Sequence, residues 1–205
     1  MHSNDEMVRF LVQTSVLYTS SLVAAFSKVD RKDFVLAENK ADPYVDYPLQ
    51  IGHGQTISQP WTVAFMLELL QPEPGDKVLD VGSGSGWTTG LLSAAVGPKG
   101  CVYGLEIVPE LVTFGKKNLK KYGFKQAAIE QATELGLSEH APYDRILVSA
   151  AAEKLPQALV GQLKPGGRMV IPIKSSVWLI EKTATGLVEK QYPGFAFVPL
   201  RTDDD

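Results

Sequence analysis

Short runs rich in β-branched and aliphatic residues alternate with segments of helical pattern between residues 77 and 173. The alternation predicts strands at 77–81, 100–108, 127–132, 143–150 and 168–173, with helices at 87–96, 109–122 and 156–163. Strands that alternate with helices form parallel βαβ units, because each helix returns the chain to the same edge of the sheet. The run at 143–150 is apolar almost throughout, which is typical of a strand covered on both faces. The pattern therefore predicts an α/β fold with a doubly wound, mostly parallel sheet.

Two further strands are predicted near the C-terminus, at 177–184 and 195–201. No long helix fits into the loop between them, so we expect these two strands to pair antiparallel at one edge of the sheet. Together with the earlier strands, they predict a seven-stranded sheet that ends in an antiparallel C-terminal strand pair.

The segment that precedes the sheet has a different character. Residues 6–27 have helical periodicity, and residues 30–60 are rich in proline, glycine, tyrosine and polar residues. We expect this segment to form an N-terminal helical cap over the carboxyl ends of the strands, where open α/β sheets bind ligands. A length of 205 residues, 44% of them hydrophobic, suits one globular domain. The prediction is a single domain over 1–205, with a cap segment at 1–60 and a Rossmann-like core at 61–205.

Composition and charge exclude several classes of protein. The net charge is −3 and no block of lysine or arginine resembles a nucleic-acid footprint, so no nucleic-acid partner is expected. The single cysteine, Cys101, excludes an intrachain disulfide, and no His/Cys cluster has metal-ligand spacing, so no metal is expected. Without a long apolar run or a signal-peptide pattern, a cytoplasmic protein without membrane contact is expected. The acidic residues Asp203 to Asp205 are expected to fray.

The glycine-rich stretch KVLDVGSGSGWTTG at 77–90 follows the first strand of the core. A dinucleotide-binding loop needs glycine at its first, third and sixth positions. Gly82 and Gly84 satisfy the first two, but the sixth position is Trp87, and the third glycine, Gly86, comes one residue early. No Gly-Lys-Ser/Thr follows, so the phosphate-binding P-loop pattern fails as well.

Two acidic residues decide between the remaining ligands. Asp80 ends the first strand, where a carboxylate would repel a pyrophosphate and attract a cation. S-adenosylmethionine carries two cationic groups, a sulfonium and an ammonium. Glu106 ends the second strand and can accept hydrogen bonds from ribose hydroxyls, a role that NAD would accept equally well. The residues predict S-adenosylmethionine; the alternative is a tight strand-to-helix turn with two ordinary surface acids.

Longer motifs carry a family resemblance from about residue 8 to residue 200. They are IGHGQTISQP (51–60), APYDRILVSAAA (141–152), QLKPGGRMVIPI (162–173) and FVPL (197–200), preceded by RKDFV (31–35), Tyr44 and Asp46. With these motifs in this order, the chain resembles the protein-L-isoaspartate O-methyltransferases. VLDVGSGSG is shared by many class I S-adenosylmethionine-dependent methyltransferases and is specific only to that superfamily.

The resemblance implies an activity and a set of site residues. The activity is methyl transfer from S-adenosylmethionine to the α-carboxylate of L-isoaspartyl (D-aspartyl) residues, which initiates repair of damaged proteins through a succinimide. The expected partners are isoaspartyl-containing proteins or peptides, bound by a monomer. Ser58 stands at the family's active-site serine. The implied cofactor-binding residues are Thr56, Ile57, Ser58, Asp80, Gly82, Ser83, Gly84, Gly86, Glu106, Ile107, Ala132 and Thr133. The implied substrate-binding residues are His53, Ser58, Val198, Pro199 and Leu200.

The chain departs from the family pattern at three places. The usual Gly-Asp-Gly after the third strand is Gln131-Ala132-Thr133, which removes an acid that helps to fix adenine. The usual Ala-Ala-Ala-Pro ends in Glu153, and the usual Val-Pro-Arg is Val29-Asp30-Arg31. These departures leave two alternatives open: a class I methyltransferase with another substrate, and a cofactor-binding homologue without catalysis.

The chemistry of methyl transfer is compatible with the residues present. A carboxylate is already ionised at pH 7, so no general base is required and the site must mainly supply orientation. Ser58 can hold the substrate carboxylate, cap the helix that follows at Pro60, or do both. His53 is either a base for a neutral substrate or an ordinary loop histidine. Trp61 and Trp87 either flank the cofactor or pack the cap against the core.

Overall fold

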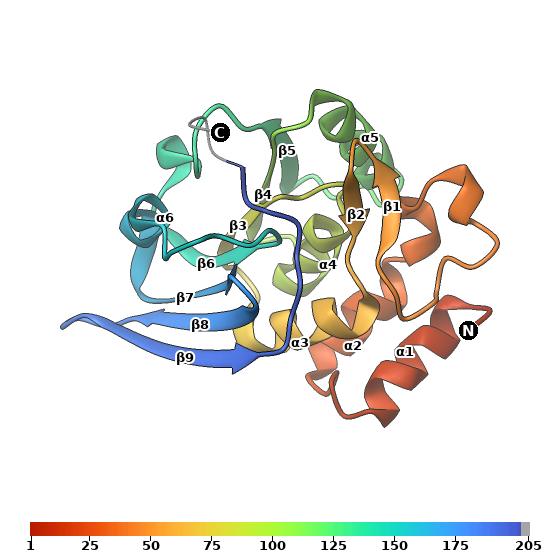
Figure 1. Cartoon of the computed structure of the whole chain (residues 1–205), viewed down its shortest axis with the longest axis horizontal. Helices are drawn as coiled ribbons and strands as arrows, with labels where there is room; N and C mark the ends of the chain where they lie inside the picture. Colours follow the sequence, from red (N-terminus) through yellow and green to blue (C-terminus); the bar gives the residue numbers. More distant parts are fainter. Residues whose placement is uncertain (202–205) are drawn as a thin grey trace.

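The computed structural model describes residues 1–201, so Asp203 to Asp205 lie outside the described residues. One seven-stranded sheet runs through the molecule in the order β5-β4-β3-β6-β7-β8-β9 (Figure 1). Its strands are β3 (Lys77–Val81), β4 (Cys101–Glu106), β5 (Ala127–Gln131), β6 (Tyr143–Val148), β7 (Leu163–Ile173), β8 (Ser176–Lys182) and β9 (Leu187–Pro193). All pairs from β5 to β7 are parallel, and β8 and β9 are antiparallel to their neighbours. The predicted fold class is confirmed.

Helices cover both faces of this sheet. They are α3 (Pro60–Leu70), α4 (Trp87–Val96), α5 (Pro109–Lys120) and α6 (Gln157–Gln162). Consecutive residues of a strand point to opposite faces, so Val78 joins the core beneath α3, α4 and α5, whereas Leu79 joins a second core beside α6. Burial on both faces explains why the central strands are continuously apolar in sequence.

The cap contains more structure than the sequence predicts. Helices α1 (Asn4–Gln13) and α2 (Ser20–Lys28) precede the short 3₁₀ turns η1 (Arg31–Phe34) and η2 (Ala37–Asn39), then the hairpin β1 (Leu49–Gly52) and β2 (Gln55–Ile57). The helical pattern at 6–27 is thus divided in two. Between α1 and α2, the buried Glu68 carboxylate on α3 accepts hydrogen bonds from the backbone N–H groups of Tyr18 and Thr19, both at 2.8 Å. These bonds replace the ones that a continuous helix would have made.

The last strand lies earlier in the chain than predicted. The sequence pattern placed it at 195–201, but β9 occupies Leu187–Pro193, an edge strand whose residues are mostly exposed and therefore lack an apolar signal. The apolar residues at 195–201 instead run back across the carboxyl ends of the strands as an extended segment (Figure 1). Ala151 holds this segment, because its N–H donates to the Val198 carbonyl and its carbonyl accepts from Leu200 N–H, both at 2.8 Å.

None of the helices within residues 1–201 is long and apolar enough to span a bilayer.

Candidate active site

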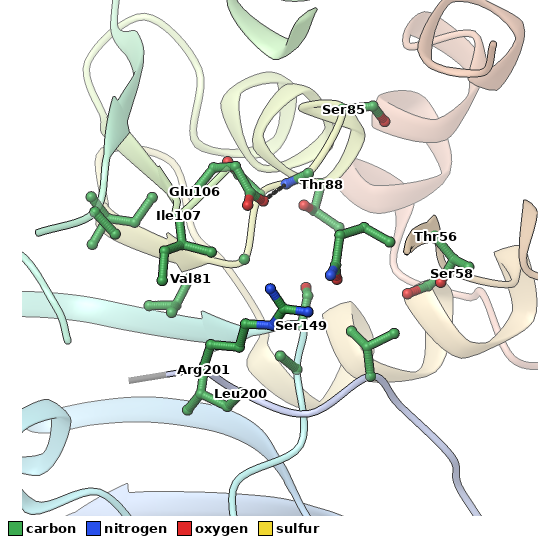
Figure 2. A pocket seen from close by; sticks show the side chains of 18 of the residues that line it. Thr56, Ser58, Val81, Ser85, Thr88, Glu106, Ile107, Ser149, Leu200 and Arg201 are labelled. Atoms are coloured by element: carbon green, nitrogen blue, oxygen red, sulfur yellow. Dashed lines mark hydrogen bonds between the residues drawn. The ribbon is translucent and has the colours of Figure 1, made fainter. Parts of the chain in front are cut away.

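A cavity lies at the carboxyl ends of β3, β4 and β6, between the sheet and the cap. Glu106 and Ile107 stand on one side of it, Thr56 and Ser58 on the other, with Ser149 and Arg201 between them (Figure 2). Three parts of the chain far apart in sequence therefore form one site. Its main lining residues are Ile51, Gln55, Thr56, Ile57 and Ser58 from the cap, Gly82, Ser83, Gly84, Ser85, Glu106, Ile107, Ala132, Glu134, Ser149 and Ala150 from the core, and Val198, Pro199, Leu200 and Arg201.

The glycine-rich loop after β3 forms the floor of the cavity. Gly82 and Gly84 have φ values of 77° and 52°, in the left-handed region that favours glycine. The N–H groups of Gly82 and Ser83 both donate to the Leu105 carbonyl, at 2.8 and 2.9 Å, so β4 fixes the loop. Gly86 does not line the cavity. A Cβ there would lie 3.3 Å from Gly115 Cα on α5, so this glycine permits close helix packing instead.

Glu106 faces the cavity from the end of β4. Its side chain is buried, with Oε2 accepting from Gly84 N–H at 2.8 Å and Oε1 accepting from Val108 N–H at 3.0 Å. A carboxylate offers about four acceptor positions, so both oxygens can still accept bonds from a ligand. This geometry suits a pair of vicinal hydroxyls such as those of a ribose.

Asp80 lies below the loop, where it is fully buried, and does not line the cavity. Its Oδ2 accepts from the hydroxyls of Thr88 at 2.7 Å and Thr89 at 2.6 Å. Its Oδ1 has no hydrogen-bond partner among residues 1–201, and burial raises the pKa of Asp80 to about 6. An incompletely paired buried carboxylate is stabilised by a positive charge nearby, so Asp80 fits a cationic ligand bound above the loop.

Ser58 connects β2 to α3 and lines the cavity (Figure 2). The N-cap of α3 is Gln59, and Asp46 satisfies the helix start by accepting Trp61 N–H at 2.9 Å. The alternative that Ser58 caps the helix is therefore wrong, and its side chain is available to a ligand.

Arg31 fixes the backbone around Ser58 from below. Its guanidinium is fully buried and donates to the carbonyls of Pro43, Val45, Tyr47 and Ser58, the last at 3.2 Å. Burial lowers the pKa of Arg31 to about 10, which leaves it protonated at neutral pH. One cation thereby joins the 43–47 loop to the serine segment.

Trp87 and Trp61 have separate environments. Trp87 is buried, stands edge-on to Phe26 of α2 with ring centroids 5.7 Å apart, and also lines the cavity. Trp87 therefore both packs the cap against the core and contacts the cavity. Trp61 stacks on Phe65 within α3 and lies outside this cavity.

The structure does not bring every predicted residue into the cavity. His53 is exposed at the tip of the β1–β2 hairpin, with φ of 56°, and Thr133 is also exposed; neither lines the cavity. Ala132 does line it, tied to β4 by its N–H bond to the Glu106 carbonyl at 2.9 Å. Glu134 lines the same wall and accepts from the Ser138 hydroxyl at 3.1 Å.

Three polar lining residues, Gln55, Ser149 and Arg201, are not among the predicted site residues. Ser149 directly follows β6, so the rule that ligands bind at the carboxyl ends of parallel strands could have identified it. Gln55 lies within the motif at 51–60, but nothing in its residue type or position singles it out, and Arg201 follows the Pro199-Leu200 segment without a signal of its own. Figure 2 shows the Arg201 guanidinium pointing toward the middle of the cavity.

Within residues 1–201, no three His, Cys, Asp or Glu side chains are grouped so that they could hold a metal ion.

Comparisons with known proteins agree on one family. A family model described as protein-L-isoaspartate(D-aspartate) O-methyltransferase matches residues 2–205. Protein-L-isoaspartate O-methyltransferase of Methanopyrus kandleri is 43% identical, over 97% of this chain and 91% of the relative. That of Aeropyrum pernix is 46% identical, over 95% of this chain and 77% of the relative. A crystal structure from Plasmodium falciparum, described under the same enzyme name and in complex with S-adenosyl-L-homocysteine, has a TM-score of 0.87 at 27% identity and covers 98% and 99% of the two chains.

Proposed function

This chain belongs to the protein-L-isoaspartate(D-aspartate) O-methyltransferase family, and on that premise we propose how its cavity divides between methyl donor and protein substrate. The chain is an S-adenosylmethionine-dependent enzyme that methylates the carboxylate of L-isoaspartyl residues in protein repair. The cofactor would supply an electrophilic methyl group on a sulfonium sulfur. A carboxylate oxygen would attack the methyl carbon in line, and the sulfur would leave as the thioether of S-adenosylhomocysteine with the electrons of the broken C–S bond. The observation that carries the division is that one cavity has Glu106 and the glycine loop on one side and Ser58 on the other.

The donor side is assigned to residues of the core. We propose that Glu106 accepts the ribose hydroxyls and that the backbone of Gly82 and Gly84 lies against the methionine end. Buried below them, Asp80 contributes negative charge that favours a sulfonium and an ammonium over a pyrophosphate. The adenine is assigned to the wall formed by Ala132 and Glu134.

The acceptor side is assigned to the cap and the C-terminal segment. We propose that the Ser58 hydroxyl donates to the substrate carboxylate, which lies against the backbone from Val198 to Leu200. No residue has to remove a proton, because the carboxylate is ionised at neutral pH. Holding the reacting atoms in line can lower a barrier by about 7–11 kcal/mol in favourable cases, so the residues act mainly through orientation.

A single copy of the chain is proposed to carry out this reaction on cytoplasmic isoaspartyl proteins, without nucleic acid or membrane. The residues assigned to both sides of the cavity belong to one copy of the chain, so the proposed reaction requires no residue from a second copy. The cap segment 1–60 and the core 61–205 are proposed to form one methyltransferase domain. One hydrophobic cluster that extends from Met7 in α1 to Val177 in β8 supports that unity.

A matched pair of peptides tests the assignment of the acceptor side. An L-isoaspartyl peptide should accept labelled methyl, and its normal aspartyl counterpart should not. Ser58→Ala should lower turnover at least severalfold while S-adenosylhomocysteine affinity stays within about twofold, and Ser20→Ala on the exposed side of α2 serves as the control. Equal labelling of the two peptides would favour a different substrate, and unchanged turnover in Ser58→Ala would remove Ser58 from the acceptor site.

A further inference from the structure

A second cavity adjoins the first on the side of Ser58. It has a volume of about 650 Å³ and shares four residues with the first cavity, namely Thr56, Ser58, Ser149 and Val198. The remaining lining residues, beyond this shared wall, are Pro48, Gln59, Trp61, Thr62, Pro193, Gly194, Phe195, Ala196 and Phe197. We call this second cavity the aromatic groove.

The walls of the aromatic groove are held in place by ring stacking. Phe65 of α3 lies between Trp61 and Phe195, with centroid distances of 5.5 and 5.2 Å and interplanar angles of 9° and 21°. Tyr192 of β9 meets Phe65 edge-on at 5.3 Å. The N–H groups of Gly194 and Phe195 also donate to the Ser175 carbonyl, at 3.1 and 3.0 Å. These contacts, all within the chain, fix the walls of the groove.

The aromatic groove is neutral and largely apolar. None of its lining residues is Asp, Glu, Lys or Arg. The Gln59 side-chain amide at its edge already donates to Asp46 Oδ2 at 2.9 Å. An acidic side chain in this groove would lose hydration without gaining a charged partner, whereas an apolar side chain gains free energy in proportion to the area it buries.

We propose that the aromatic groove binds the polypeptide on one side of the isoaspartyl residue and takes a large apolar side chain from a flanking position. The inference rests on the proposed function of Ser58 and Val198 at the junction of the two cavities. Because the cofactor fills the first cavity beyond that junction, the substrate chain has to leave through the other side. Aromatic and branched aliphatic side chains fit the stacked rings of Trp61 and Phe195, and acidic side chains are disfavoured.

Isoaspartyl peptides of equal length test this selectivity. Each peptide has glycine at every flanking position except one, and that position carries Phe, Leu, Ser or Asp. The substituted position is in turn each of the two nearest residues on either side of the isoaspartyl residue. At one position, we expect Phe or Leu to raise kcat/KM roughly 5- to 10-fold over glycine, and Asp to lower it. Equal kcat/KM for all the peptides, or a preference for Asp, would overturn the proposal.

Variants of the groove connect the selectivity to named residues. Trp61→Ala and Phe195→Ala should each reduce the Phe-to-glycine ratio of kcat/KM toward one, whereas Phe195→Leu should preserve most of it. Tyr18→Ala removes an aromatic ring that is 66% exposed and lies outside both cavities, and it should leave the ratio and the basal rate unchanged. Circular dichroism and the thermal shift with S-adenosylhomocysteine identify any variant that fails to fold. If both alanine variants kept the wild-type Phe-to-glycine ratio of kcat/KM, the proposal would be overturned.

Failure of the groove is distinguishable from failure of the proposed function. If glycine-flanked isoaspartyl peptide is methylated and flanking residues have no effect, the function stands and the groove proposal falls. If no isoaspartyl peptide is methylated, the dissociation constants of the same peptides for the S-adenosylhomocysteine-loaded protein decide the matter. Tighter binding of the Phe and Leu peptides would support the groove, and equal or absent binding would overturn it.

Discussion

Asp80 combines complete burial with an incompletely satisfied carboxylate directly below the ligand loop. Two threonine hydroxyls bond Oδ2, while Oδ1 has no partner among the residues described. Burial raises the pKa of Asp80 to about 6. The free protein therefore binds this proton more tightly than the unfolded chain does, and the stability that the proton provides is lost as pH rises from about 4 to 6.

S-adenosylmethionine affinity should depend on pH through this residue. A cation above the loop favours ionised Asp80. Below pH 6 the Asp80 carboxyl must therefore lose its proton when the cofactor binds, and this weakens the affinity. We expect the dissociation constant to rise roughly tenfold between pH 7 and pH 5 in the wild type, and to be nearly flat in Asp80→Asn. The variant should also bind more weakly at pH 7, yet its stability relative to the wild type should improve as pH rises from about 4 to 6. Isothermal titration and thermal melts across this range measure both effects; identical pH profiles would contradict the assignment.

Ala132 and Glu134 provide a second test at single residues. Ala132 lines the cavity where the family usually has an acid, and Glu134 lines the same wall. Because a hydrogen bond to a charged acceptor contributes roughly 1.5–3 kcal/mol, Ala132→Asp should tighten S-adenosylmethionine binding by about 10- to 100-fold. Glu134→Ala should weaken it in the wild-type background. If neither variant changes the dissociation constant, at one pH and salt, by more than about twofold, the adenine is held elsewhere.

Among the helices and strands, the position of the ligand loop depends on how closely α4 and α5 pack. A Cβ on Gly115 of α5 would lie 2.7 Å from Ile129 Cδ1 and 3.2 Å from the Gly84 carbonyl oxygen. Ile129 is buried on β5 and has little room to move. The loop is thus supported by a helix that contributes no motif of its own to the ligand site.

Gly115→Ala should therefore impair binding from outside the cavity. We expect a loss of about 1–3 kcal/mol in the free energy of unfolding, because the extra methyl overpacks the core, and severalfold weaker S-adenosylhomocysteine binding. Gly161→Ala on α6 is the matched control, since a Cβ there meets nothing within 4 Å. That control should be neutral or stabilising by up to ~1 kcal/mol. Denaturant titration and calorimetry measure both variants, and equal behaviour of the two would refute this coupling.

Across the molecule as a whole, cap and sheet share one hydrophobic cluster. It includes Met7 and Phe26 of the cap helices, Trp87 of α4, and Val170 and Val177 of the sheet. Within the core, backbone hydrogen bonds to Ala151 attach the C-terminal segment to the end of the parallel strands. The cap and the sheet each bury apolar surface of the other, so we expect neither of them to unfold while the other stays folded.

Cap and core should consequently unfold in one cooperative transition. Tryptophan fluorescence, which reports on Trp61, Trp87 and Trp178 and so includes the contact of Trp87 with the cap, and far-ultraviolet circular dichroism should give coincident denaturation curves. S-adenosylhomocysteine at 100 times its dissociation constant should stabilise the fold by about 2.7 kcal/mol, which corresponds to a rise in Tm of roughly 5–10 °C. NAD should give no shift. Separate transitions for the two probes, or stabilisation by NAD alone, would contradict these expectations.

Features set by neighbouring residues could be predicted from the sequence. The central strands are apolar runs buried on both faces, so local pattern indicated them, and the glycine-rich loop after β3 was recognisable from its composition. The carboxylate of Asp80 at the end of β3 and Trp87 at the sixth loop position indicated the class of ligand, because a negative charge there disfavours a pyrophosphate. The exposed edge strand β9 was misplaced, because a strand with little buried surface has no apolar pattern to detect.

Features that depend on contacts between distant parts of the chain could not be predicted in this way. Glu68 divides the first helix, Arg31 holds the backbone of Ser58, and Arg201 reaches the cavity, each across many residues of sequence. His53 stays outside the cavity because it lies at the exposed tip of the hairpin, although it belongs to the motif IGHGQTISQP at 51–60. Local pattern reports the burial and dihedral angles of nearby residues, whereas these positions follow from long-range packing. The order of residues was therefore sufficient to specify the sheet and the class of ligand, but which side chains meet around that ligand depends on how the folded chain packs.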